Sequence, residues 1–216
     1  MNIHNEIKIF SANSNLKNLN ILDLGCGSPY SYFCLFKELK EKNGKNIYYT
    51  GVDRIDEFNI FHNNNPQRLE PATYEIETKD WVNRFNGQAC GDFELQDDYH
   101  IDEATFCTHF KFHFGTDVGE FILTNNDLQK YDIIILSNLL HKLNHSTAES
   151  VFDKCLTLMH ADSIIYVSVL GENYNGLLPE DNSYKLERYS EMKAKIRTVN
   201  HYEDINDHLI FIGEKR

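Results

Sequence analysis

Residues 20–30 have the sequence NILDLGCGSPY, and this stretch decides the fold. Asn20–Leu24 is an apolar run typical of a buried strand, and a glycine-rich turn follows it. An amphipathic pattern then predicts a helix from about residue 30 to residue 42, and the β-rich run IYYTGVD follows at residues 47–53. A strand, a helix and a strand of these lengths form a βαβ unit, which predicts a parallel sheet.

The second half of the chain continues this alternation. The run YDIIILSN, residues 131–138, is continuously apolar, as expected for a parallel strand that is buried on both faces. The string STAE at residues 146–149 predicts the start of a helix through a capping box, and a further strand is expected at residues 162–171. Two β segments, residues 195–202 and 208–216, predict a closing antiparallel pair. The fold class is therefore α/β, with a doubly wound, mostly parallel sheet in one domain over residues 1–216.

Composition and charge restrict the classes of function. The 216 residues are 41% hydrophobic and 25% charged, which is ordinary for a globular protein and excludes wholesale disorder. The net charge of −12 repels phosphate backbones and anionic membranes, so nucleic acid is a disfavoured partner. The apolar runs are too short to span a bilayer, and no signal peptide is expected at the N-terminus. Together with five irregularly spaced cysteines, these features predict a cytoplasmic protein with reduced thiols.

The glycine-rich turn predicts a ligand site. Gly25 and Gly27 let the backbone approach a ligand closely, because neither residue carries a Cβ. Asp23 ends the strand before the turn, and Asp53 ends the second strand, where a carboxylate can hold both ribose hydroxyls of a nucleoside. A dinucleotide site would need a small residue where Tyr30 stands. The pattern therefore favours a nucleoside ligand with an amino-acid end and no phosphate.

These residues resemble the class I S-adenosylmethionine-dependent methyltransferases. The string DLGCG at residues 23–27 matches the first motif of that family, although Pro29 replaces its usual third glycine, and residues 137–141 match its strand-four motif. The resemblance implies a Rossmann-like fold, S-adenosyl-L-methionine as the cofactor, and methyl transfer, first to an O or N atom of a small molecule. A protein or RNA acceptor, or a non-catalytic domain that binds a nucleoside or a partner, are the alternatives. The cofactor-binding residues that it implies are Asp23, Gly25, Cys26, Gly27, Asp53, Arg54, Asp117, Val118, Ser137 and Asn138.

The family also has an acid after its third strand, and two segments compete for that strand. Residues 109–115, followed by Asp117, leave a spacing to the strand at residue 131 that fits the family. The rival uses residues 72–78 with Asp80. The first is preferred, and it makes residues 57–108 an insertion after strand two. This insertion is expected to be a peripheral lobe that supplies part of a substrate lid. Residues 86–107 within it contain six acids and no Lys or Arg, which indicates either a solvated face or a lid that disfavours anionic substrates.

His141 is the candidate catalytic residue, because it lies just past strand four, where the methyl acceptor approaches in this family. An imidazole there could act as a general base, or it could simply pack against the following turn. No metal is expected, because the spacing of Cys90, His100 and Cys107 matches no zinc signature. Since the first strand begins by about residue 20, no N-terminal helical cap is expected.

Overall fold

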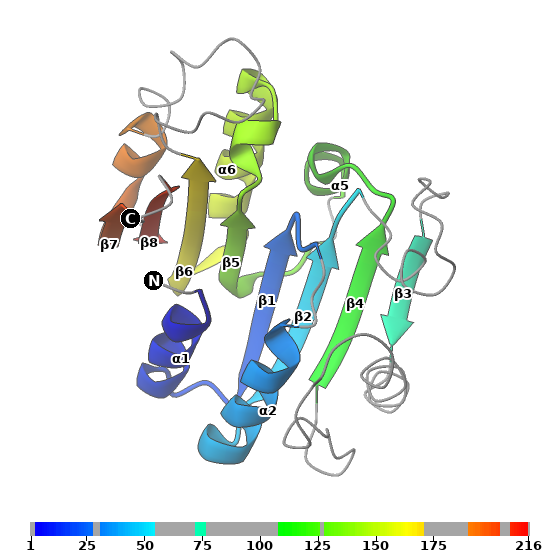
Figure 1. Ribbon diagram of the computed structural model, residues 1–216, viewed down its shortest axis with the longest axis vertical. Coiled ribbons are helices and arrows are strands. Elements are labelled where there is room, and N and C mark those ends of the chain that lie inside the picture. The colour runs from blue at the N-terminus through cyan, green and yellow to red at the C-terminus, as the bar shows by residue number, and fades with distance from the viewer. Residues whose placement is uncertain are drawn as a thin grey trace.

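The computed structural model describes residues 3–27, 31–54, 72–76, 108–125, 128–170, 190–203 and 208–215, and these are built around one eight-stranded sheet (Figure 1). The strand order is β3-β4-β2-β1-β5-β6-β8-β7. The strands are β1 (Asn18–Leu24), β2 (Asn46–Val52), β3 (Ala72–Ile76), β4 (Thr108–Phe114), β5 (Tyr131–Ser137), β6 (Met159–Leu170), β7 (Ile196–Glu203) and β8 (His208–Lys215). The main helices are α1 (Ile3–Asn13), α2 (Ser31–Asn43), α5 (Val118–Thr124) and α6 (His145–Thr157).

The centre of the sheet is parallel. β1 pairs in parallel with β2 and β5, β2 pairs with β4, and β5 pairs with β6. β8 runs antiparallel between β6 and β7, so the predicted mostly parallel sheet with a closing antiparallel pair is confirmed. The arrowheads of the five parallel strands point to the same edge of the sheet in Figure 1, where the loops with the predicted site residues begin. That edge is where ligands bind in open parallel sheets.

The sequence offered two candidates for the third parallel strand, residues 109–115 and residues 72–78, and the structure places β4 there. It pairs in parallel with β2, and Val52 lies opposite His113. Ala72–Ile76 instead forms β3, which pairs antiparallel with β4 at the outer edge of the sheet. The preferred assignment of strand three is therefore confirmed. Apart from β3, residues 57–107 lie outside the described residues, and the lid stays a prediction.

Helices cover both faces of the sheet, as a doubly wound fold requires. α1 and α2 lie in front of the sheet in Figure 1, and their Ile7 and Phe36 pack with Tyr49 of β2 in one buried cluster. α5 and α6 cover the other face, where Ile122 and Phe152 belong to a second cluster. Each fully buried aromatic or aliphatic side chain of this kind stabilises the fold by about 1.5–3 kcal/mol. No helix among the described residues is long and apolar enough to cross a membrane.

The N-terminal helix α1 contradicts the expectation that no helical cap precedes the first strand. Ile3, Ile7 and Phe10 recur at the i, i+4, i+7 spacing of an amphipathic helix and pack against the cluster beneath α2. Four residues, 14–17, separate the end of α1 from the start of β1. The helix covers a face of the sheet and its packing stabilises the core.

The start of α6 also differs from the prediction. Its N-cap is Asn144, whose side-chain oxygen accepts a hydrogen bond from the backbone N–H of Thr147 at 2.9 Å. The Ser146 hydroxyl donates to the same oxygen at 3.1 Å, so Ser146 lies inside the first turn and does not cap it. Asn is as good an N-cap as Ser, and the capping-box pattern pointed two residues too late.

Candidate functional site

The glycine turn after β1 is fixed to the end of β2 by backbone hydrogen bonds. The N–H groups of Gly25 and Cys26 both donate to the carbonyl oxygen of Val52, at 2.7 and 3.2 Å. Gly25 and Gly27 have φ angles of 78° and 54°, in the left-handed region that residues with a Cβ rarely adopt. The turn therefore needs both glycines for its shape, as the sequence predicted.

Asp53 joins this turn through its side chain. Its Oδ2 accepts a hydrogen bond from the backbone N–H of Gly27 at 2.8 Å. A Cβ built on Gly27 would meet no atom of the described residues within 4 Å, its chain neighbours aside, so none of those residues fills the space beside the turn. Because a carboxylate offers about four lone-pair sites, Asp53 can support the turn and still accept hydrogen bonds from a ligand in that space.

The loop after β4 is tied to the same acid. The backbone N–H of Asp53 donates to the carbonyl oxygen of His113, and the N–H of Thr116 donates to the carbonyl oxygen of Asp53, both at 3.1 Å. Arg54 lies beside Asp117, with 4.0 Å between Nε and Oδ2. The loops that follow β1, β2 and β4 thus form one hydrogen-bonded edge.

Asp117 also organises the helix that follows it. Its Oδ1 accepts from the backbone N–H of Glu120 at 3.1 Å and caps α5. The next residue, Val118, is the first residue of α5 and is buried. The family resemblance places these two residues beside an adenine, and the structure shows their structural task as a cap and a core contact.

The loop after β5 completes the site. Asn138 has a φ of 53°, which is uncommon for a residue other than glycine. Its N–H donates to the carbonyl oxygen of Ser168 at 2.8 Å, and the Ser168 hydroxyl donates to its Oδ1 at 3.3 Å. The resulting bend brings Leu139 so close to Gly25 that a Cβ on Gly25 would lie 3.2 Å from the Leu139 Cδ1. Ser137 ends β5 just before this bend and is half-buried.

Asp23 lies beneath the turn and is 2% exposed. Its Oδ2 accepts a hydrogen bond from the Tyr49 hydroxyl at 2.7 Å. Burial raises the pKa of the Asp23 carboxyl from 3.8 to about 7, the hydrogen bond from Tyr49 opposes that rise, and the charge of nearby Asp53 adds to it. The candidate site therefore contains a carboxyl group whose pKa lies near neutrality.

Sequence reasoning missed the residues that pack beneath the glycine turn. A Cβ on Gly51 would lie 2.9 Å from the Cys26 Sγ and 3.0 Å from the Phe112 Cδ1 and the Tyr49 Cε1, so Gly51 makes room for the thiol. A glycine inside a strand signals such a close approach, but it does not name the neighbour. Nothing in the sequence pairs Tyr49 with Asp23.

His141 is buried just after β5. It belongs to the short 3₁₀ helix η2 (Leu140–Lys142) just after β5, and its side chain is 7% exposed. His145 begins α6 one turn later and is exposed. The structure therefore places His141 at the predicted position along the chain but inside the protein, and its role as a base stays a prediction.

Metal ligands do not gather among the described residues. No group of three or more His, Cys, Asp or Glu side chains there could hold a metal ion. Cys90, His100 and Cys107 lie outside the described part of the chain. The ring of His113 packs against that of Phe121, with 4.6 Å between the centroids.

Comparison with known proteins supports the fold. The sequence matches no protein-family profile and no curated protein. TehB from Haemophilus influenzae is similar in structure, with a TM-score of 0.54 and 13% identity over 98% of this chain and 62% of that chain. An O-methyltransferase family 2 protein from Planctomyces limnophilus, solved with apigenin, has a TM-score of 0.52 and 14% identity over 96% of this chain and 56% of that chain. A TehB-like SAM-dependent methyltransferase from Corynebacterium glutamicum has a TM-score of 0.50 and 13% identity over 100% of this chain and 89% of that chain.

At these identities the likeness concerns the fold. This chain spans less than two thirds of the length of two of these three proteins. The neighbours include class I S-adenosylmethionine-dependent methyltransferases, so the Rossmann-like fold that the sequence predicted is confirmed. The chain has the fold of that group of enzymes.

Proposed function

We propose that this protein binds S-adenosyl-L-methionine and transfers its methyl group to an O or N atom of a small molecule. The observation that carries the proposal is the hydrogen bond from the Gly27 N–H to the Asp53 carboxylate, at a glycine whose Cβ position none of the described residues occupies. It places an acid that suits two ribose hydroxyls beside a turn that admits a close ligand. Many folds have a tight turn after a strand, but the acid in hydrogen-bond contact with it favours a nucleoside.

The residues present fit that cofactor. Asp53 would hold the ribose, with Arg54 at the rim, and Asp117 and Val118 would lie beside the adenine. The turn at residues 25–27 would lie along the amino-acid end, above the buried Asp23. Ser137 and Asn138 would line the opposite side of the cofactor site. The site is rich in carboxyl groups, which accept hydrogen bonds from hydroxyl and ammonium groups and repel phosphates.

The cofactor, when bound, supplies an electrophilic methyl group. The work left to this chain is to hold that group and an acceptor in line, because orientation alone accounts for a large part of the rate in such displacements. The loops after β1, β2 and β4 support this role because backbone hydrogen bonds link them, and Leu139 of the loop after β5 lies against Gly25. His141 is proposed to take the acceptor's proton where the acceptor is a hydroxyl.

The charge of the protein supports a small acceptor. A net charge of −12 disfavours polyanionic substrates, including RNA. A neutral or cationic metabolite would approach this surface without electrostatic opposition. Hydroxyl and amine acceptors both satisfy this condition, and the proposal covers both.

A transfer assay tests the proposal. The full chain is incubated with methyl-labelled S-adenosylmethionine and, separately, with metabolite, protein and RNA fractions of the source cells. Label is expected in the metabolite fraction, and Asp53→Ala should lower it by at least about tenfold. Asp153→Ala, which removes an exposed acid of α6, is the matched control and should keep its activity. Label in the protein or RNA fraction would replace the small-molecule acceptor, and cofactor binding without any transfer would indicate a non-catalytic domain.

A further inference from the structure

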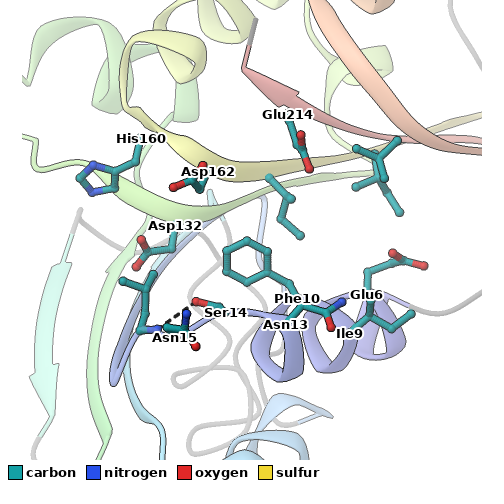
Figure 2. Close-up of a pocket in the computed structure, with 14 residues that line it drawn as sticks. Glu6, Ile9, Phe10, Asn13, Ser14, Asn15, Asp132, His160, Asp162 and Glu214 are labelled. Carbon is teal, nitrogen blue, oxygen red and sulfur yellow. Dashed lines mark hydrogen bonds between the residues drawn. The ribbon is translucent and has the colours of Figure 1, made fainter.

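A groove lies at the amino ends of the parallel strands, opposite the candidate site at their carboxyl ends. It has a volume of about 650 Å³ and lies between α1, the beginnings of β5 and β6, and the end of β8. Asp132 comes from the beginning of β5, His160 and Asp162 come from that of β6, and Glu214 comes from β8 (Figure 2). Because the parallel strands begin here and the site loops follow their other ends, the groove is separate from the proposed cofactor site.

Exposed apolar side chains gather along this groove. Four large apolar side chains are strongly exposed among the described residues, and three of them line it: Ile9 at 48%, Leu16 at 43% and Val199 at 49%. Leu123 of α5 is the fourth and does not line the groove. The buried Ile164 and Ile212 also belong to the lining. Apolar side chains gathered at one place on a surface mark an interaction site, whereas scattered ones do not.

The groove is also acidic. Its lining contains the carboxyl groups of Asp162 and Glu214 and those of the buried Glu6 and Asp132, of which Asp132 accepts a hydrogen bond from the Asn20 N–H, and none of the described lining residues is Lys or Arg. The neighbouring Arg197 pairs with Glu214 and partly offsets this charge. Acid side chains around an apolar surface favour an occupant that carries both apolar and basic groups.

The α1–β1 loop, which forms one wall, is held in place. The ammonium group of the buried Lys45 donates to the backbone carbonyl oxygens of Ser14 at 2.7 Å and Leu16 at 2.5 Å. The Leu16 N–H also donates to the Ser14 hydroxyl at 3.1 Å. The wall that presents Leu16 is therefore preformed, which lowers the entropic cost of binding.

We propose that this groove binds a basic, amphipathic segment of a partner protein. Apolar side chains of that segment would cover Ile9, Leu16 and Val199, and its Lys or Arg groups would face the carboxyl groups of the groove. A second copy of this chain fits less well, because both copies carry a net charge of −12. The proposal is independent of methyl transfer, since it uses none of the site residues.

A peptide-binding measurement tests the proposal. The probe is a fluorescein-labelled peptide of about 14 residues, or four helical turns, with Leu on one face and Lys on the other. Anisotropy is measured at about 0.15 M salt, where non-specific attraction is screened. The full chain should bind this probe at least about tenfold more tightly than a Lys–Ser peptide of the same charge or a Glu–Leu peptide of the same apolar content.

Matched substitutions locate the binding. Val199→Ser and Asp162→Lys should each weaken binding at least about fivefold. Leu123→Ser and Glu191→Lys make equivalent changes at residues that do not line the groove, and should leave binding within about twofold of the wild type. Thermal melts check that all four variants are folded.

Three results would overturn the proposal. The first is equal binding of the Lys–Leu and Lys–Ser probes, and the second is equal weakening by the groove variants and their controls. The third is a wild-type dimer in sedimentation that Val199→Ser converts to monomer, because the groove would then belong to an interface between copies of this chain.

Discussion

At the residue scale, Asp23 couples stability to pH. Its folded pKa of about 7 lies above the ordinary value of 3.8, so the folded state binds a proton more tightly than the unfolded state. The stability that the neutral carboxyl contributes is therefore complete below about pH 4 and is lost as the pH rises toward 7. Asn in place of Asp23 keeps an acceptor for the Tyr49 hydroxyl and cannot ionise.

We expect Asp23→Asn to remove this pH dependence. Between about pH 5.5 and pH 8, the unfolding free energy of the wild type should fall by about 2 kcal/mol relative to the variant, since each pKa unit corresponds to 1.36 kcal/mol. Urea titrations of both proteins at the two pH values measure this difference. Parallel changes in the two proteins would mean that Asp23 titrates far from neutrality.

Gly51 is the residue whose substitution should disturb the glycine turn from below. The Cβ of Gly51→Ala would lie 2.9 Å from the Cys26 Sγ, so the thiol and its turn must shift. We expect a loss of about 1–3 kcal/mol in unfolding free energy, as for other overpacked sites. Adding Cys26→Ala removes the clashing sulfur and should restore about half of the loss or more. Denaturant unfolding of both variants measures this, and an unrescued double variant would place the clash on Phe112 or Tyr49.

His141 is tested by its effect on turnover. If it accepts a proton from a hydroxyl acceptor, His141→Ala should lower turnover by about 10²–10⁴-fold and leave cofactor affinity nearly unchanged. The exposed His145, one turn further along, provides the matched control variant His145→Ala. A loss under about fivefold would make His141 a structural residue, as its burial also allows, and the acceptor would then be one that needs positioning alone.

At the scale of elements, the cap of α6 predicts that substitutions of Asn144 and Ser146 change stability by different amounts. Asn144→Ala should cost about 1 kcal/mol of unfolding free energy, because the N–H of Thr147 loses its acceptor. Ser146→Ala should cost clearly less, since the Ser146 hydroxyl only donates to the capping oxygen. Thermal or urea unfolding compares the two variants. A larger loss at Ser146 would support the capping box that the sequence suggested.

Some of the helices and strands were predictable from the sequence, and others were not. The strands of the parallel core were predictable, because runs such as residues 131–138 are apolar throughout and the glycine turn fixes the βαβ unit. The position of Asp53 beside the turn followed from strand order. The helix α1 has amphipathic spacing at Ile3, Ile7 and Phe10, and it was missed because Asn residues interrupt and follow that pattern. The pairing of Asp23 with Tyr49 was not predictable, since it depends on which side chains face each other across two strands.

At the scale of the whole molecule, the two ends of the parallel strands carry two separate surfaces. The edge at the carboxyl ends of the parallel strands holds Asp23 and Asp53 among linked loops, whereas the opposite edge has the acidic groove beside α1. The sheet separates these surfaces, so a partner in the groove would leave the proposed cofactor site open. The overall charge is consistent with both proposals, because it disfavours polyanions at either edge.

The central claim is that the chain binds S-adenosylmethionine at the turn shared by Gly27 and Asp53. Calorimetric titration of the wild type, Asp53→Ala and Asp153→Ala with S-adenosylhomocysteine, the demethylated product, tests it most directly. Asp53→Ala should weaken binding by about 1.5–3 kcal/mol, the scale of hydrogen bonds to a charged group, and Asp153→Ala should bind as the wild type does. Wild-type affinity in a folded Asp53→Ala protein, or no binding by the wild type, would contradict the account.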